Sequence, residues 1–159
     1  MADGGGGHDG GDGHDGGGGH AAVVEQTVRV LVYSDDRTVR TAVHTALGRR
    51  PAPGLPRVDY VDCATAYAVT REMDAGRIDL AVFDGEATPT GGLGLCRQMK
   101  DEIFNCPPVL VLTGRPQDAW LATWSKADAA VPHPLDPELL AENAAALLRD
   151  RLAGAASRG

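Results

Sequence analysis

Short apolar runs alternate five times with amphipathic stretches along this chain, and the alternation restricts the possible folds more than any other feature. The runs are bounded by turn-forming residues, as in parallel strands that are covered on both faces. Right-handed crossovers between such strands predict an α/β fold with a doubly wound parallel sheet, and 2-1-3-4-5 is the common strand order for five strands. We predict the strands at residues 28–33, 58–63, 78–84, 109–112 and 129–131.

The stretches between these strands carry apolar residues at the spacing of one helix face. We predict helices at residues 38–47, 65–76, 93–102, 117–126 and 137–152. The last helix has a favourable N-cap in Asp136 and a proline at its first position. Its predicted apolar face consists of Leu139, Leu140, Leu147, Leu148 and Leu152.

The amino-terminal segment differs from the rest of the chain. Its first twenty residues hold eleven glycines, four Asp and three His, with almost nothing apolar to offset the entropy of ordering. We therefore predict a disordered tail at residues 1–24, one domain at 25–153 and a flexible carboxyl terminus at 154–159. The tail lacks the basic start and apolar stretch of a secretory signal, and no apolar run is long enough to span a membrane.

Charge and cysteine content narrow the functional classes. Removing the four tail Asp from the formal net charge of −7 leaves about −3 for the body, so we expect no nucleic-acid partner. The three cysteines, Cys63, Cys96 and Cys106, are odd in number and form no CxxC motif. We interpret them as reduced core or subsurface thiols of a cytoplasmic protein.

Acidic residues follow two strands that the predicted order makes neighbours. Asp84 ends the third strand, and Asp35 and Asp36 follow the first. Because the carboxyl ends of parallel strands meet at one edge of the sheet, these carboxylates should converge. Their mutual repulsion is relieved by protonation or by a hard divalent cation. A Mg2+ ion bound by two carboxylates, a backbone carbonyl and waters is the simplest prediction.

Polar residues at the ends of the fourth and fifth strands complete this predicted site. The hydroxyl of Thr113 supplies a hydrogen-bond donor, and Gly114 after it leaves a gap through which a phosphoryl group can approach. His133 follows the fifth strand and is placed to face that group as a cation.

Four segments, in order, resemble the receiver domain of two-component response regulators over about residues 27–152. They are VLVYSDD, IDLAVFD, VLVLTGR and ADAAVPHP. The resemblance implies the flavodoxin-like (βα)5 receiver fold and Mg2+ as the cofactor. It also implies that Asp84 is the phosphoacceptor, Asp35 a direct metal ligand, the Glu86 carbonyl a third ligand and Thr113 the hydroxyl that follows the phosphoryl group, with Asp36 as a further metal candidate.

The chain departs from the receiver pattern at four positions. Ser34 replaces the first residue of the acidic pair, and His133 replaces a lysine that is always a cation. Ala130 stands where an aromatic usually swings inward on activation, and Pro89 lies one position late. These changes predict a weakened metal site and an interrupted switch relay.

Two tryptophans, Trp120 and Trp124, stand four residues apart on the predicted fourth helix. They suit either packing against the last helix or a surface where a protein partner binds, since exposed tryptophans are frequent hot spots. The sequence leaves both interpretations open.

Three functional hypotheses follow, and neither of the first two is an enzyme. The first is a stand-alone receiver, phosphorylated by a histidine kinase or a small phosphodonor, because too few residues follow Leu152 for an output domain. The second is a degenerate receiver that acts as a binding module. It resembles actinobacterial stand-alone receivers associated with the respiratory NADH:quinone oxidoreductase, which would place a cytoplasmic protein at the inner face of the membrane through its partner. The third, a flavin or nucleotide binder, is disfavoured because SDDRT would repel phosphate.

Overall fold

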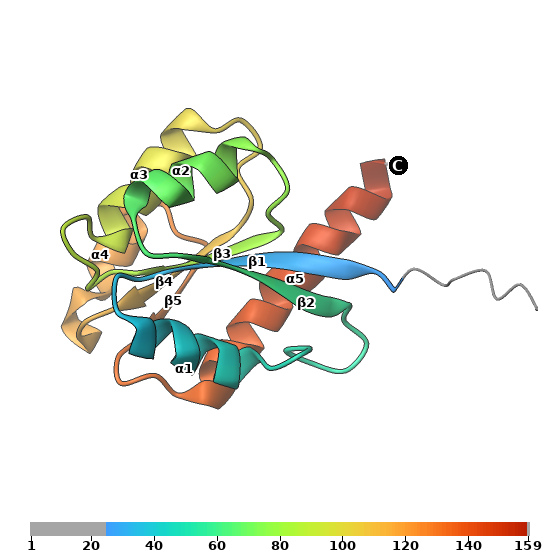
Figure 1. Ribbon diagram of the computed structural model, residues 1–159, viewed down its shortest axis with the longest axis horizontal. Helices are drawn as coiled ribbons and strands as arrows, with labels where there is room; N and C mark the ends of the chain where they lie inside the picture. Colours follow the sequence, from blue (N-terminus) through green and yellow to red (C-terminus); the bar gives the residue numbers. More distant parts are fainter. Residues whose placement is uncertain (1–24, 159) are drawn as a thin grey trace, which may run out of the picture.

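The computed structural model describes residues 25–158 as a parallel five-stranded sheet in the order β2-β1-β3-β4-β5, flanked by helices (Figure 1). The predicted fold class and strand order are confirmed. The predicted tail at residues 1–24 lies outside the described residues. The elements are β1 (Thr27–Tyr33), α1 (Arg37–Leu47), β2 (Arg57–Cys63), α2 (Ala66–Asp74), β3 (Leu80–Asp84), α3 (Gly92–Glu102), β4 (Val109–Thr113), a 3-10 turn (Pro116–Asp118), α4 (Ala119–Trp124), β5 (Ala129–Pro132) and α5 (Pro137–Arg158).

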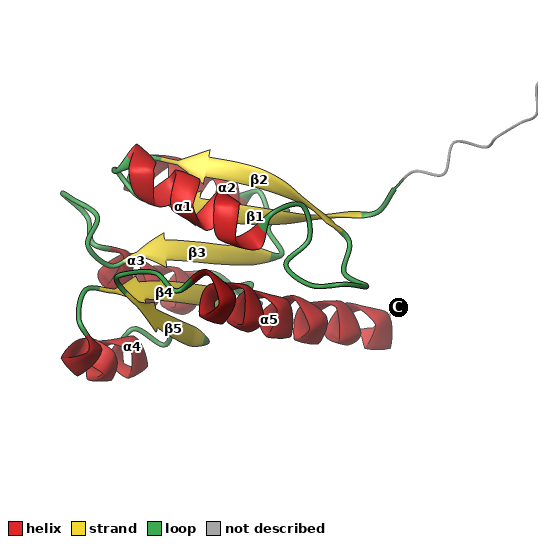
Figure 2. Cartoon of the chain, turned by 90° about the horizontal axis from the view of Figure 1, so that it is seen from below, coloured by secondary structure: helices red, strands yellow, loops and turns green. Residues whose placement is uncertain are grey.

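The sheet separates two hydrophobic cores. Helices α1 and α5 cover one face, in front of the strands in Figure 2, and α2 and α3 cover the other. Successive strand residues point to opposite faces, so Val30 and Val32 enter the α1/α5 core whereas Leu31 and Tyr33 enter the α2/α3 core. Every residue of β3 and β4 is buried, which explains why these strands are apolar without alternation.

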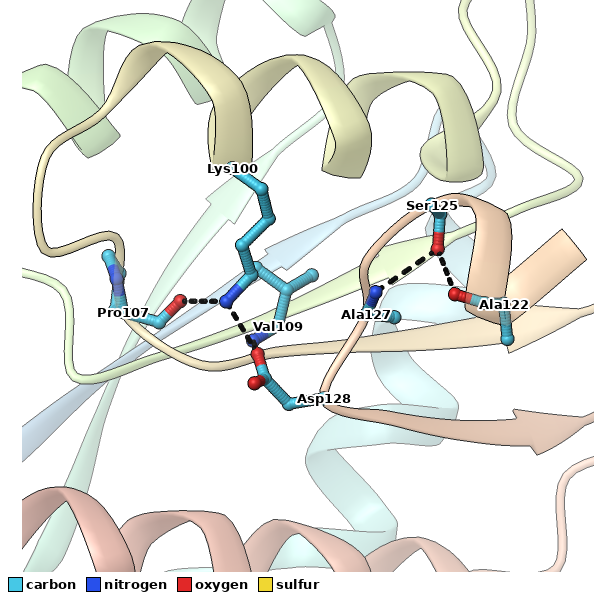
Figure 3. Close-up of polar contacts among 7 residues, drawn as sticks. All are labelled: Lys100, Pro107, Val109, Ala122, Ser125, Ala127 and Asp128. Carbon is cyan, nitrogen blue, oxygen red and sulfur yellow. Dashed lines mark hydrogen bonds and ion pairs between the residues drawn. The ribbon is translucent and has the colours of Figure 1, made fainter.

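Asp128 connects the amino ends of β4 and β5 to α3 (Figure 3). Its Oδ2 accepts hydrogen bonds from Lys100 Nζ (2.6 Å) and from the backbone N–H of Val109 (2.8 Å). Nearby, Ser125 closes the end of α4: its hydroxyl donates to the carbonyl of Ala122 (2.7 Å) and accepts from the N–H of Ala127 (3.3 Å). These contacts tie the amino ends of β4 and β5 to the neighbouring helices.

The last helix differs from the prediction in two respects. Leu139 is 38% exposed and not in the core, because the buried stripe follows Leu140, Ala144 and Leu148 at four-residue spacing, about 100° further around the helix. In addition, α5 continues to Arg158 where we predicted a flexible end after residue 153, since its last turns are rich in alanine, a strong helix former. No helix in the described part of the chain is long and apolar enough to cross a membrane.

The three cysteines are free thiols, and their predicted position in or just beneath the core is confirmed. Cys63 and Cys96 are buried, and Cys106 is partly exposed. Burial, assisted for Cys63 by the negative charge of Glu72, raises the pKa of Cys63 to about 11 and that of Cys96 to about 12.

Burial also raises the pKa of Cys106, but Cys106 is partly exposed whereas Cys63 and Cys96 are buried, and this difference predicts selective alkylation. The thiolate is the nucleophile, so at pH 8 a thiol whose pKa is 11 to 12 is ionised in about one molecule per thousand or fewer. We expect iodoacetamide to modify Cys106 first in the folded protein, and all three cysteines only after unfolding in urea. Peptide mass spectrometry measures the order, and labelling of Cys96 as fast as Cys106 would contradict it.

Candidate functional site

Strand β3 places Asp84 at the carboxyl edge of the sheet with only 2% of its surface exposed. The register aligns Asp84 with Leu112 of β4 and Phe83 with Tyr33 of β1, so the ends of these three strands lie side by side. A carboxylate at this depth loses most of its hydration and needs polar partners from the protein. The neighbouring strand ends supply them.

Three groups surround the Asp84 carboxylate. The Ser34 hydroxyl donates to its Oδ2 (2.8 Å), and the backbone N–H of Glu86 donates to its Oδ1 (2.9 Å). His133 Nε2 lies 3.3 Å from the same Oδ1. The structure thus brings together Asp84 and His133 as the strand order implied, with imidazole and carboxylate in direct contact.

Sequence reasoning treated Ser34 only as a missing acid, but the structure gives it a role of its own. Ser34 is fully buried, and besides donating to Asp84 its hydroxyl accepts from the N–H of Asp36 (3.0 Å). Its carbonyl accepts from Arg40 Nη1 (2.5 Å). A hydroxyl in place of a second carboxylate turns repulsion of Asp84 into a hydrogen bond. The sequence does contain a signal for this role of Ser34, because a serine stands there between a buried strand and an acidic residue.

Asp35 lies nearby but is bound to the loop that follows β3. Its two carboxylate oxygens accept from the N–H of Thr88 (3.0 Å) and from the Thr88 hydroxyl (3.1 Å). These hydrogen bonds, the backbone one first, lower the pKa of Asp35 below its ordinary value. Thr88 was not singled out from the sequence, because loop residues are brought to a site only by tertiary contacts.

Asp36 takes a different position. Its Oδ1 accepts from the N–H of Thr38 (2.8 Å) and caps the amino terminus of α1.

The pKa of Tyr33 shows that negative charge gathers at this edge. Burial is the largest cause that raises this pKa above its ordinary value, and the charges of Asp35 and Asp84 raise it further. Within residues 25–158 no group of three or more His, Cys, Asp or Glu side chains is arranged to hold a metal ion.

The donor set nevertheless fits magnesium. Mg2+ prefers oxygen and is commonly bound by one or two carboxylates, waters and the oxygens of a phosphate group. Asp35 and Asp84 supply two carboxylates, and the Glu86 carbonyl is a third oxygen on the loop after β3. Binding would require Asp35 to exchange its hydrogen bonds with Thr88. The metal roles of Asp35, Asp84, Glu86 and Asp36 stay predictions.

The predicted phosphoryl-facing residues lie on the other side of Asp84. Thr113 is buried at the end of β4, and its carbonyl accepts from the N–H of His133 (2.8 Å), which joins the β4 and β5 edges. Gly114 follows it, and the Glu86 carboxylate occupies the space that a side chain at this position would need. Thr113, Gly114 and His133 therefore line the edge next to Asp84.

The two tryptophans lie on the surface of α4, with 65% of Trp120 and 45% of Trp124 exposed. The guanidinium carbon of Arg97 lies 5.0 Å from the Trp124 ring centroid, and Arg97 Nη1 donates to the Trp124 carbonyl (2.9 Å). Of the two accounts left open by the sequence, packing against the last helix does not describe Trp120, because most of its side chain is exposed.

Comparison with known proteins identifies the family. No protein-family model matches the chain. It is 58% identical over 122 residues to a response regulatory protein of Mycobacterium tuberculosis (strain H37Rv), covering 77% of this chain and 92% of the relative. It is 31% identical over 129 residues to the transcriptional regulatory protein CseB of Streptomyces avermitilis, covering 80% of this chain and 51% of CseB. The chain belongs to the response regulator family.

A solved structure supports the same assignment at the level of fold. A CheY-like response regulator receiver domain protein from Methanospirillum hungatei superposes with a TM-score of 0.65 at 20% identity, over 81% of this chain and 99% of that one. The receiver domain described here therefore has the family's sheet order.

Gly92 fixes the distance between α3 and the Asp84 backbone in this receiver domain. A β-carbon at Gly92 would lie 2.6 Å from the Asp84 carbonyl oxygen, far inside van der Waals contact. A β-carbon at Gly94, two residues later in the same helix, would have no neighbouring atom within 4 Å. The two glycines therefore allow a matched comparison, because an added methyl group clashes at Gly92 and meets open space at Gly94.

We expect Gly92→Ala to lower the free energy of unfolding by about 1–3 kcal/mol through overpacking. Gly94→Ala should raise it by about 0.5–1 kcal/mol, because alanine restricts the unfolded chain and favours helix. Urea denaturation measures both values. Equal midpoints for the two variants would show that α3 does not press on Asp84 as described.

Proposed function

We propose that this receiver domain is an atypical single-domain response regulator in phosphorelay signalling, with Asp84 as phosphoacceptor and protein contact as output. The supporting observation is the environment of Asp84: a buried carboxylate at the strand edge, bound by Ser34 and the Glu86 N–H, with His133 at 3.3 Å. A histidine kinase or a small acyl phosphate is the phosphodonor, and the receiver domain is assigned to residues 25–153. On this assignment the protein is a signalling protein and not an enzyme.

The residues divide the chemistry among them. An Asp84 oxygen attacks phosphorus, a new P–O bond forms, and the bond to the donor nitrogen or oxygen breaks with its electron pair leaving on the donor. The Ser34 hydroxyl and Glu86 N–H hold the carboxylate in one orientation for that attack. An N–H of His133 donates a hydrogen bond to the added phosphoryl oxygens, and Thr113 faces them from the end of β4. Mg2+, when bound, offsets the negative charge of the phosphoryl group.

The proposed phosphorylation of Asp84 can be tested directly by mass spectrometry and NMR. The protein is incubated with Mg2+ and acetyl phosphate and weighed by intact mass spectrometry, and beryllofluoride binding is followed by 19F NMR. We expect one phosphoryl adduct and one bound beryllofluoride signal, both abolished in Asp84→Asn, whose amide is not a nucleophile.

Chelating Mg2+ should also remove the signal, since the phosphoryl oxygens then lack their counter-charge. If the native chain behaves like Asp84→Asn at every Mg2+ concentration tested, Asp84 is not a phosphoacceptor.

The exposure of Trp120 supports a second function, a non-phosphorylated binding module or accessory subunit of a larger complex. Two tryptophans on one helix, one of them under a guanidinium, match the composition of protein interfaces. The respiratory NADH:quinone oxidoreductase is the specific candidate partner, and binding to it would hold this protein at the inner face of the membrane.

Trp120→Ala is the variant that tests the surface. We expect it to weaken capture of the respiratory complex from native membranes by about tenfold or more, the effect of losing a hot-spot side chain. Its unfolding midpoint should stay nearly unchanged because the ring packs little. Tyr67→Ala, which removes a 75% exposed aromatic from α2, is the control. Equal capture by both variants would place the interface elsewhere.

A further inference from the structure

An open cavity lies at the amino edge of the sheet, opposite the edge that carries Asp84. It has a volume of about 640 Å3 and is bounded by the turn before β3, the turn before β4 and the last turns of α5. The end of α5 forms one wall because the helix projects past the starts of β3, β4 and β5 (Figure 2). The lining includes five apolar side chains, those of Met73, Ile78, Ile103, Pro107 and Leu152.

Phe104 stands at this cavity and protrudes into solvent. With 91% of its surface exposed, it is the most exposed large apolar side chain in the described part of the chain. It follows the end of α3, and the next residue, Asn105, has a left-handed backbone conformation with a φ of 55°. The turn therefore directs the phenyl ring away from the core between α2 and α3. Burial of such a ring against apolar side chains is favourable.

The cavity also carries adjacent charges of opposite sign. Asp150 and Arg151 are consecutive residues of α5, and both belong to the lining. Arg151 Nε lies 4.0 Å from Asp79 Oδ1, which is too far for a hydrogen bond. Among the side chains that the structure describes, Asp150 takes part in no ion pair. Both charges can therefore pair with charged groups of another molecule.

We propose that this surface is the interface of a two-fold symmetric dimer, in which Phe104 of each copy enters the cavity of the other. A two-fold interface brings the same patch of two molecules together, so a protruding group and the cavity that receives it must lie on one surface. Phe104 and the cavity meet this condition. The same symmetry pairs Asp150 of each copy with Arg151 of the other. The dimer leaves Asp84 of both copies open, because Asp84 lies at the opposite edge of the sheet.

Four variants test which face forms the contact. Phe104→Ala removes the protruding ring. Gly154→Leu fills the cavity from α5, because a β-carbon at Gly154 has no neighbouring atom within 4 Å and leucine is a good helix former. Tyr67→Ala and Trp120→Ala are the controls: each removes an exposed aromatic side chain that does not line the cavity.

Sedimentation equilibrium over about 5 to about 500 µM protein measures the dissociation constant of each dimer. We expect the native chain to dimerise within this range. The constant should rise about tenfold or more in Phe104→Ala and Gly154→Leu, the effect of losing a central aromatic contact. It should stay unchanged in Tyr67→Ala and Trp120→Ala. Urea midpoints should not fall in any variant, because none of the four replaces a buried side chain.

Charge reversal tests the two-fold geometry independently. Asp150→Arg brings arginines together across the interface, and Arg151→Asp brings aspartates together. Each variant alone should therefore be monomeric at concentrations where the native chain is a dimer. An equal mixture of the two variants should form a heterodimer, because opposite charges again face one another at both places.

Three results would overturn this proposal. One is a native chain that stays monomeric at the highest concentration. Another is a dimer that survives Phe104→Ala or that Trp120→Ala dissociates, since the contact would then lie on a different face. The third is a mixture of Asp150→Arg and Arg151→Asp that associates no more strongly than either variant alone, since the reciprocal pairing would then be absent. None of these results bears on phosphorylation of Asp84.

Discussion

The burial of one carboxylate, Asp84, at the end of β3 is the constraint on which the rest of the edge depends. A charge removed from water must be compensated locally, and here compensation comes from a hydroxyl directly after β1, a backbone N–H of the loop after β3 and an imidazole after β5. Each of these groups belongs to a different segment. The carboxylate therefore holds together the ends of strands that otherwise meet only through backbone hydrogen bonds.

Packing beneath the edge makes this arrangement rigid. β3 and β4 are buried along their whole length, and Gly92 lets α3 approach the Asp84 backbone more closely than any other residue would allow. At the opposite edge, Asp128 fixes the starts of β4 and β5 against α3. A strand that is packed on both faces cannot slide along its axis. The side chains at its end therefore have defined positions.

The site's departures from the receiver pattern form a consistent set. Ser34 removes one negative charge beside Asp84 and supplies a hydrogen bond, Asp36 caps a helix, and Asp35 is held by Thr88. Each change lowers the repulsion that would otherwise demand a cation. Glu86 places a carboxylate on the opposite side, toward β4. The result is an edge that keeps a buried carboxylate at the end of β3, with hydrogen-bonded Asp35 and Ser34 on one side of it and the Glu86 carboxylate on the other.

The sequence by itself predicted the sheet order and the convergence of Asp84 with His133, because apolar runs and turn residues mark the strands and the crossovers between parallel strands are almost always right-handed. It also located the thiols in the core. It did not determine that Leu139 faces solvent, that α5 continues to Arg158, or that Thr88 binds Asp35. Those outcomes depend on which residue of a helix meets the sheet and on how a loop folds back over a strand end. Only tertiary structure decides them, because the competing local arrangements differ little in energy until distant residues come into contact.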